Sequence, residues 1–294
     1  MSLVATLISH PAERALTPAL LDMASRALMA TGSRWLAAGI ACDLALPDGF
    51  DANVDPGLTA DLASRRIDLV VQPAAGRRKR LLLADMDSTM IDQECIDELA
   101  DEVGLKDHVA AITARSMNGE IAFEPALRER VALLAGLDAG VIDRIVANRL
   151  TLASGGRELV ATMRSHGAWT ALVSGGFTAF TARIAQKLGF DENRANILLE
   201  ANGRLSGKVA EPILGREAKA AALVEIAAHL GISTADSIAV GDGANDLDML
   251  ALAGAGVALH AKPAVAEQAR IRIDHGDLTA LLYIQGYAEA DFSQ

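Results

Sequence analysis

Cysteine, aromatic residues and positive charge are all scarce in this chain of 294 residues. The two cysteines, Cys42 and Cys95, lie far apart, which excludes a disulfide framework and a cysteine metal site and indicates buried thiols in a reducing compartment. Aromatic residues make up 3% and the formal net charge is −11. Nucleic-acid-binding proteins need a basic surface and often stacking rings, so no nucleic-acid partner is expected.

Long apolar runs are missing as well. No stretch reaches the roughly 18 residues that a transmembrane helix needs. The start, MSLVATLISHPAER, has neither the basic residues nor the apolar core of a signal peptide. With 51% hydrophobic and 22% charged residues, the composition is that of a folded globular protein. We expect a cytoplasmic protein with no membrane partner, large enough for one main domain and a smaller one.

Residues 1–75 have the pattern of a small α/β domain. The expected elements are a strand at 2–10, a helix at 17–31, an apolar strand at 35–46, and a short helix and strand that end near Val71. A segment rich in turn residues and arginine, 72–80, follows this domain and ends in RRKR. A patch for a partner is one interpretation of the basic run, and a solvated linker is the favoured one.

The remainder of the chain alternates strands and helices in the segments 76–92 and 153–294, which predicts a doubly wound parallel sheet. The segment 93–152 is almost wholly helical by its apolar spacing. It interrupts the alternation directly after the first strand, where an insertion would cover the strand ends as a lid does. An Asn-Gly turn at Asn202 between two short extended runs predicts a β-hairpin.

The apolar run at 81–84 stops at two aspartates one residue apart, Asp85 and Asp87. Open α/β sheets bind their ligands at the carboxyl ends of the strands, so these carboxylates are expected in a binding site. At an effective dielectric of about 20, two such charges ~4 Å apart repel by roughly 4 kcal/mol. The pair therefore needs a proton, a cation or water nearby.

Three further polar elements follow apolar segments in the same way. Ser174 with Gly175 follows WTALV, and Asp242 follows SIAV within GDGANDLDM. Lys219 lies near the start of a helical segment that leads into the Asp242 strand. Each alone has an ordinary structural explanation as a turn, a solvated charge or a helix cap. A second Ser-Gly-Gly triplet at Ser154 follows no comparable strand, and its serine is expected to cap the next helix.

Taken together and in order, these elements resemble the four motifs of the haloacid dehalogenase superfamily of phosphotransferases. The matching residues are Asp85-Met86-Asp87-Ser88-Thr89, Ser174, Lys219 and Gly241-Asp242-Gly243-Ala244-Asn245-Asp246. The resemblance implies an α/β fold with a doubly wound, Rossmann-type parallel sheet and a helical cap inserted after the first strand. It covers residues 80–290, with the core at 76–92 and 153–294 and the cap at 93–152.

The resemblance also implies roles for these residues. Uncatalysed phosphate-monoester hydrolysis is slow enough to need enhancements up to about 10²¹-fold, of which acid–base catalysis supplies about 10²–10⁴. Covalent catalysis and concentrated positive charge must supply the remainder. Asp85 is implied as the nucleophile and Asp87 as the acid and base. Mg²⁺ is implied as the cofactor, held by Asp85, Asp242 and the main-chain oxygen of Asp87.

Further implied roles concern the phosphoryl group. Lys219 would offset its charge and hold Asp85, while Ser174 and the amide of Gly175 would bind its oxygens. Asp246 would orient metal-bound water. Asn245 matches a contact to substrate or phosphate in the superfamily, and a turn role is its alternative.

Within the superfamily the chain is most similar to the phosphoserine phosphatases. That resemblance implies that Glu94 meets the ammonium group of phosphoserine and Arg130 its carboxylate, while Met117 and Phe123 wall the site. Without the resemblance, Glu94 and Arg130 would read as solvated helix charges. Residues 1–75 are implied, by position alone, to form a divergent ACT-like domain. A homodimer is compatible with the sequence.

The sequence is compatible with two other functions. The enzyme could act on another small phosphomonoester, or it could pass the aspartyl phosphate to another alcohol, such as homoserine, in place of water. Alternatively, the chain could be an amino-acid sensor acting through residues 1–75, with a vestigial phosphatase site. The intact set of Asp85, Asp87, Ser174, Lys219 and Asp242 weighs against the sensor.

Overall fold

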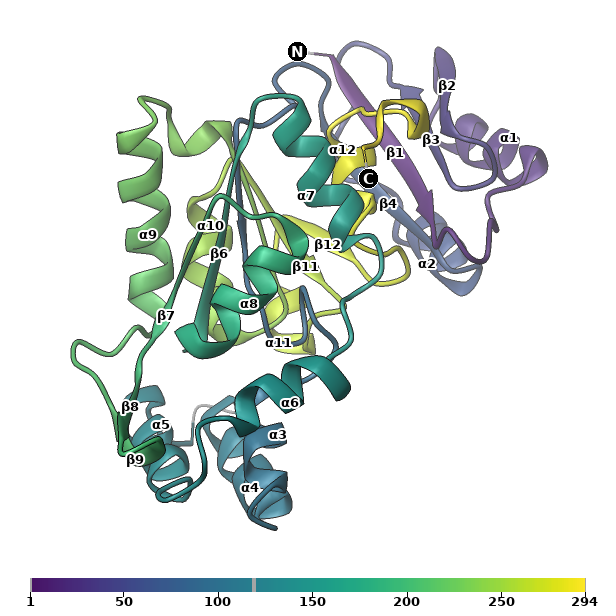
Figure 1. Cartoon of the computed structure of the whole chain (residues 1–294). Coiled ribbons are helices and arrows are strands. Elements are labelled where there is room, and N and C mark those ends of the chain that lie inside the picture. The colour runs from purple at the N-terminus through teal and green to yellow at the C-terminus, as the bar shows by residue number, and fades with distance from the viewer. Residues whose placement is uncertain (1, 118–119, 294) are drawn as a thin grey trace.

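The computed structural model describes residues 2–117 and 120–293, with the backbone alone at residue 117. Three parts are visible in Figure 1: an N-terminal sheet domain, a central parallel sheet between helices, and a helical insertion at the lower edge of the view. Within the described ranges, no helix combines the length and the apolar character needed to cross a bilayer.

The N-terminal domain is a four-stranded antiparallel sheet with the strand order β2-β3-β1-β4. Its elements are β1 (Leu3–Ser9), α1 (Pro18–Ala27), β2 (Gly32–Ala37), β3 (Ala41–Ala45), α2 (Pro56–Ser64) and β4 (Ile67–Pro73). This β-α-β-β-α-β order is that of ferredoxin-like folds. The relation to ACT domains stays a prediction.

Two expectations for this domain are wrong in detail. The single strand expected at 35–46 is a hairpin, because Gly39 takes a left-handed φ of +75° and reverses the chain between β2 and β3. The first helix ends at Ala27, before the predicted end at Thr31. Thr31 instead donates its backbone N–H to Ala45, which begins the pairing of the two strands.

The central sheet contains six parallel strands in the order β12-β11-β10-β5-β6-β7. They are β5 (Leu81–Ala84), β6 (Trp169–Phe177), β7 (Glu192–Asn196), β10 (Ser237–Gly241), β11 (Ala255–Leu259) and β12 (Ile271–Ile273). The order reverses between β5 and β10, so the loops that follow these two strands diverge and leave a crevice. This confirms the predicted doubly wound parallel sheet.

Alternate residues of β5 join two separate apolar clusters, one on each face of the sheet. Leu82 and Ala84 pack with helices α7, α8 and α12, whereas Leu81 and Leu83 pack with α9, α10 and α11. The helices are α7 (Gly156–Ser165), α8 (Thr178–Leu188), α9 (Arg216–His229), α10 (Leu247–Leu252), α11 (Pro263–Ala266) and α12 (Ala280–Ile284), with 3-10 turns at Thr234–Asp236, Ala244–Asp246 and Glu289–Asp291. Burial on both faces explains the unbroken apolar run at 81–84.

The helical insertion comprises α3 (Cys95–Asp101), α4 (Lys106–Met117), α5 (Phe123–Ala132) and α6 (Val141–Asn148). The hairpin of β8 (Leu198–Ala201) and β9 (Arg204–Val209) lies against it, as Figure 1 shows. The N–H groups of Gly136 and Ala139 donate to Leu205 and Gly203 of this hairpin at 2.8 and 2.9 Å. The Asn-Gly turn prediction is confirmed, with positive φ at both turn residues.

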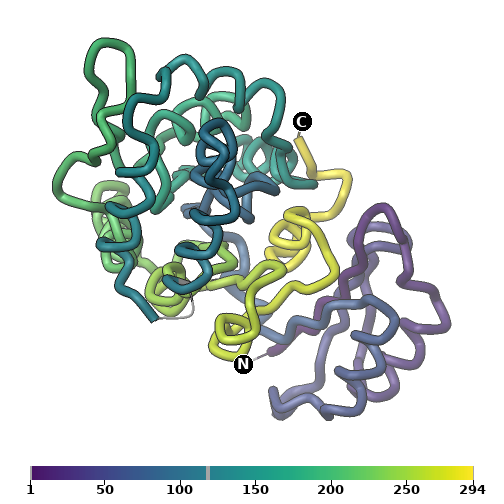
Figure 2. Tube along the Cα trace, turned by 90° about the horizontal axis from the view of Figure 1, so that it is seen from below, coloured from purple at the N-terminus to yellow at the C-terminus, as the bar shows by residue number. Residues whose placement is uncertain are grey.

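The N-terminal domain packs against the C-terminal segment, drawn in yellow in Figure 2. Arg77 makes a two-pronged hydrogen bond to Asp43 at 3.1 and 2.8 Å, and its side chain is only 14% exposed. Arg78 lies over the ring of Tyr287, 4.2 Å from its centroid. The prediction of a solvated linker is therefore wrong for Arg77, which joins this segment to the N-terminal domain, whereas the Arg78 side chain is 54% exposed.

Candidate active site

The floor of the crevice is built around the buried ammonium group of Lys219. This side chain comes from the first turns of α9, is 1% exposed, and contacts Asp85 Oδ1 and Asp246 Oδ1 at 2.7 Å each. Burial alone lowers the pKa of Lys219, but Asp246 and Asp85 reverse this effect and raise it above its ordinary value. Lys219 thus stays charged and fixes the direction of the Asp85 carboxylate.

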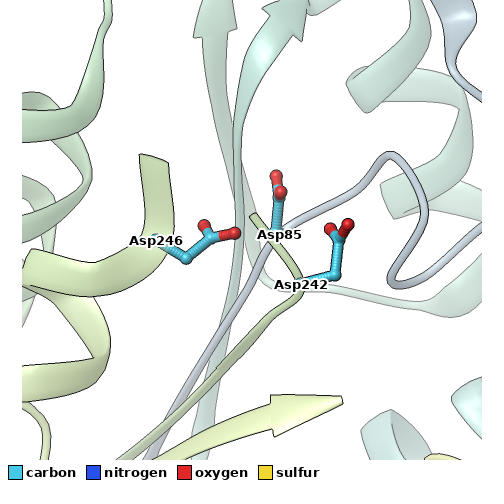
Figure 3. A group of neighbouring side chains, drawn as sticks. All are labelled: Asp85, Asp242 and Asp246. Atoms are coloured by element: carbon cyan, nitrogen blue, oxygen red, sulfur yellow. The ribbon is translucent and has the colours of Figure 1, made fainter. Parts of the chain in front are cut away.

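Three aspartates form an acidic cluster at this floor: Asp85, Asp242 and Asp246 (Figure 3). Each offers one carboxylate oxygen within 4.8 Å of the others. The close approach of Asp246 requires glycine at position 241, where a Cβ atom would lie 2.3 Å from the Asp246 carboxyl carbon. Asp246 Oδ2 also accepts the N–H of Gly243 at 3.1 Å, which holds the loop after β10.

The electrostatics of the cluster favour a bound cation. Burial, followed by repulsion from Asp246, raises the pKa of Asp85 well above its usual range and that of Asp242 to about 6. Lys219 is the only buried cation that contacts these carboxylates among the described residues, and Lys262 lies 3.9 Å from Asp242 with its side chain half exposed. Oxygen donors with excess negative charge suit a hard divalent cation.

Asp87 lies next to this cluster but in a different environment. Its Oδ1 accepts the N–H of Cys95 at 2.9 Å, and its Oδ2 accepts the hydroxyl of Ser174 at 3.3 Å. Burial, followed by the charge of Glu94, raises the pKa of Asp87 to about 7. The repulsion between Asp85 and Asp87 that the sequence suggested is therefore not the main charge effect on their pKa values. The negative charge that acts most strongly on Asp87 is Glu94, and the one that acts most strongly on Asp85 is Asp246.

The loop at the end of β6 is shaped by Ser174 and two glycines. Ser174 Oγ accepts the N–H of Gly176 at 2.8 Å, which curls the loop around the hydroxyl. The ring of Phe123, from the helical insertion, fills the space where Gly175 and Gly215 would carry Cβ atoms, at 3.2 and 3.4 Å. The insertion thus reaches down to the loop and closes one side of the crevice.

These groups surround one cavity of about 280 Å³. Its lining includes, from the predicted site, Asp85, Asp87, Glu94, Phe123, Arg130, Ser174, Gly175, Asp242 and Asn245. Lys219 lies beneath the lining, bonded to Asp85. The side chain of Met117, the remaining predicted residue, falls outside the described part of the chain.

The lining of the cavity also includes Glu94 and Arg130, both from the helical insertion. Glu94 accepts the hydroxyl of Ser88 at 2.8 Å. Arg130 is 7% exposed and donates to Thr113 Oγ1 at 2.9 Å and to the carbonyl of Ala126 at 3.1 Å. The neighbouring Arg128, by contrast, is about half exposed and pairs with Glu211. Arg130 is therefore not a solvated helix charge.

Four residues that matter here were missed from the sequence. Thr113, Ser116 and Arg216 line the cavity, and Arg216 pairs with Asp248 outside it. Asn196 is buried at the end of β7, where its side-chain amide donates to the carbonyls of Gly175 and Leu214. Asn196 thereby ties the Ser174 loop to the start of α9. Unlike Ser174, Asn196 follows no apolar run, because β7 reads ENRAN, so no signal in the sequence pointed to it.

Ser154 has a structural role, though not the predicted one. Helix α7 begins at Gly156 with Gly155 as its N-cap, so Ser154 does not cap it. The Ser154 hydroxyl donates instead to Asp277 Oδ2 at 2.7 Å. This bond joins the start of α7 to the C-terminal segment.

Comparison with known proteins agrees with this geometry. A family model described as haloacid dehalogenase-like hydrolase matches residues 82–251. The chain belongs to this family. The matched range begins in β5 and ends in α10, so it contains Asp85, Lys219 and Asp242.

Relatives within the hydrolase family include phosphoserine phosphatases from Polaromonas sp. and Streptomyces coelicolor, each 43% identical over 78% of this chain. The chain spans 96% of the first protein and 56% of the second. A solved structure, described as a phospho-aspartyl intermediate analogue of phosphoserine phosphatase, is 40% identical with a TM-score of 0.66. It covers 70% of this chain and 98% of its own.

Proposed function

We propose that this hydrolase is a Mg²⁺-dependent phosphoserine phosphatase, which converts O-phospho-L-serine and water to L-serine and phosphate in the last step of serine biosynthesis. One observation carries the proposal: the acidic residues of the floor and the buried Arg130 of the helical insertion, together with Glu94, line one and the same cavity. The names of the relatives from Polaromonas and Streptomyces support the substrate.

The floor supplies a nucleophile and a proton carrier. Asp85 attacks phosphorus and forms an aspartyl phosphate, while Lys219, 2.7 Å away, keeps the carboxylate in place and offsets the phosphoryl charge. Asp87, whose pKa is raised to about 7, gives its proton to the leaving serine oxygen. It then accepts a proton from the water that hydrolyses the aspartyl phosphate, which returns both aspartates to their starting states.

The metal would be held by Asp85, Asp242 and the main-chain oxygen of Asp87, with Asp246 close by. When bound, Mg²⁺ supplies positive charge to the phosphoryl oxygens. The acidic cluster fits this ion because its donors are hard oxygen atoms that carry more negative charge than Lys219 compensates.

The helical insertion acts as the cap and selects the amino-acid part of the substrate. Arg130 pairs with the carboxylate of phosphoserine and Glu94 with its ammonium group. Phe123 closes the cavity over the Ser174 loop, where the Ser174 hydroxyl and the Gly175 amide bind phosphoryl oxygens. Asn245 contacts the substrate or phosphate from the loop after β10.

The test measures phosphate release with Mg²⁺ from phosphoserine, phosphothreonine and phosphoethanolamine, which lacks the carboxylate. We expect kcat/KM for phosphoserine to exceed that for phosphoethanolamine by at least about 10-fold, because one charge-assisted pair is lost. Asp85→Asn should abolish turnover of all three, with Asp61→Asn, an exposed carboxylate of the N-terminal domain, as the matched control. Equal rates on all three substrates would overturn the assignment of phosphoserine as the substrate, and an active Asp85→Asn variant would overturn the covalent route.

A further inference from the structure

The guanidinium of Arg130 is held at two points before any substrate arrives. Its Nε donates to the carbonyl of Ala126 one turn earlier on α5, and its Nη1 donates to Thr113 Oγ1 on α4. Arginine has five N–H donors, so three remain. They make no hydrogen bond to any other residue within the ranges 2–117 and 120–293. Arg130 and Thr113 both line the cavity, so these donors are available to a ligand there.

Thr113 is itself fixed in direction. It is 7% exposed, and its hydroxyl donates to the carbonyl of Val109 at 3.1 Å, four residues earlier on the same helix. Because the proton of the hydroxyl is used in this bond, its lone pairs are free to accept from Arg130. A chain of two hydrogen bonds therefore runs from the backbone of α4 to the guanidinium on α5.

Charges around Arg130 make this anchor necessary. Asp97, Glu94 and Asp87 all attract the guanidinium, in that order of strength. A long side chain held only by charge would follow these carboxylates, since a Coulomb attraction sets no angle. The contact with Thr113 comes from a different helix and sets the plane of the fork, on which two-pronged binding of a carboxylate depends.

We propose that Thr113 is a positioning residue for substrate selection, which orients the Arg130 guanidinium toward the carboxylate of the substrate. Thr113 need not touch the substrate to act in this way. The inference rests on the proposed phosphoserine activity and adds a residue that determines specificity.

The test uses Thr113→Val, which keeps the shape of the side chain and removes the hydroxyl. We compare kcat/KM for phosphoserine with that for phosphoethanolamine on the same protein preparation, so that any unfolded fraction cancels in the ratio. The ratio should fall by up to about 10-fold, because the most that can be lost is the preference that the charge-assisted Arg130 pair gives. The fall should lie mainly in KM for phosphoserine, and Thr113→Ser should restore most of the ratio.

Two comparisons separate positioning from a general structural effect. In an Arg130→Ala background, Thr113→Val should change the ratio less than about 2-fold, because the residue that it positions is gone. Thr181→Val removes a buried hydroxyl that bonds Asn193 in the core and should leave the ratio unchanged. An unchanged ratio in Thr113→Val, or a full effect without Arg130, would overturn the inference. Absence of phosphoserine turnover in the unmodified protein would instead overturn the proposed function.

Discussion

At the scale of single residues, Asp97 shows how the acidic residues gathered around the cavity lower the stability of the folded protein. It lies in the first turn of α3, and its Oδ1 is buried without a hydrogen-bond partner among the described residues. Burial, followed by repulsion from Glu94, raises its pKa to about 6, although Arg130 acts in the opposite direction. A carboxylate with a raised pKa destabilises the folded state when it ionises.

We therefore predict that Asp97→Asn raises the melting temperature at pH 7.5. The folded protein ionises Asp97 at about pH 6 and the unfolded chain at about pH 4, so the folded state of the natural protein loses stability as the pH rises between these values. The variant has no such loss. Its advantage should shrink as the pH falls through about 6 and should vanish near pH 4, as thermal melts across this range would show.

Asp107→Asn is the matched control for this prediction. Asp107 also lies in the first turn of a helix, α4, but is exposed. The two substitutions change the net charge and the interaction with a helix N-terminus alike. If both variants respond to pH in the same way, burial of Asp97 is not the cause.

At the scale of elements, the close packing of α10 on the sheet depends on a glycine in β11. A Cβ atom at Gly256 would lie 1.9 Å from the carbonyl oxygen of Leu250 and 2.6 Å from its carbonyl carbon. These atoms belong to the backbone, which cannot move aside as the end of a flexible side chain can. The helix that follows the Asp242 loop is thus held close to β11 at this point.

We predict that Gly256→Ala lowers the free energy of unfolding by about 2–3 kcal/mol, because α10 must move away from the strand. Gly32→Ala, in the strand β2, is the control: no heavy atom lies within 4 Å of its Cβ position. Alanine is the better strand residue, so this variant should be neutral or slightly more stable. Urea denaturation of both variants measures the difference, and equal midpoints would contradict the proposed clash.

The same scale explains which parts of the site the sequence could predict. The sequence could predict Asp85, Ser174 and Asp242, because each directly follows an apolar strand segment and strand ends meet at one edge of a parallel sheet. The sequence could not predict Thr113 and Arg216, since both lie within helices whose pattern gives no sign of which neighbour they face. Only the packing of α4 against α5 brings Thr113 to Arg130.

At the scale of the whole molecule, polar contacts that no sequence motif predicted attach the N-terminal domain to the domain of the parallel sheet. Asp68 of β4 is 6% exposed and accepts three successive backbone N–H groups from the segment after β12: Asp274 at 2.9 Å, His275 at 3.1 Å and Gly276 at 2.7 Å. Successive N–H groups of this kind form a binding concavity for an anion. Here the anion belongs to the neighbouring domain.

We predict that Asp68→Asn loosens the N-terminal domain while leaving the phosphatase site intact. An asparagine of the same shape places an NH₂ group where a carboxylate oxygen accepts, so at least one buried N–H loses its partner. The melting temperature should fall, and proteases should cut the linking segment 72–80 faster, because Arg77 no longer stays docked on Asp43. Turnover of phosphoserine should change less than about 2-fold, since none of these residues lines the cavity.

Asp61→Asn, on the exposed face of the same domain, is the control and should change neither the melting temperature nor the rate of proteolysis. If Asp68→Asn is cut no faster than this control, the three N–H bonds are not what holds the domains together.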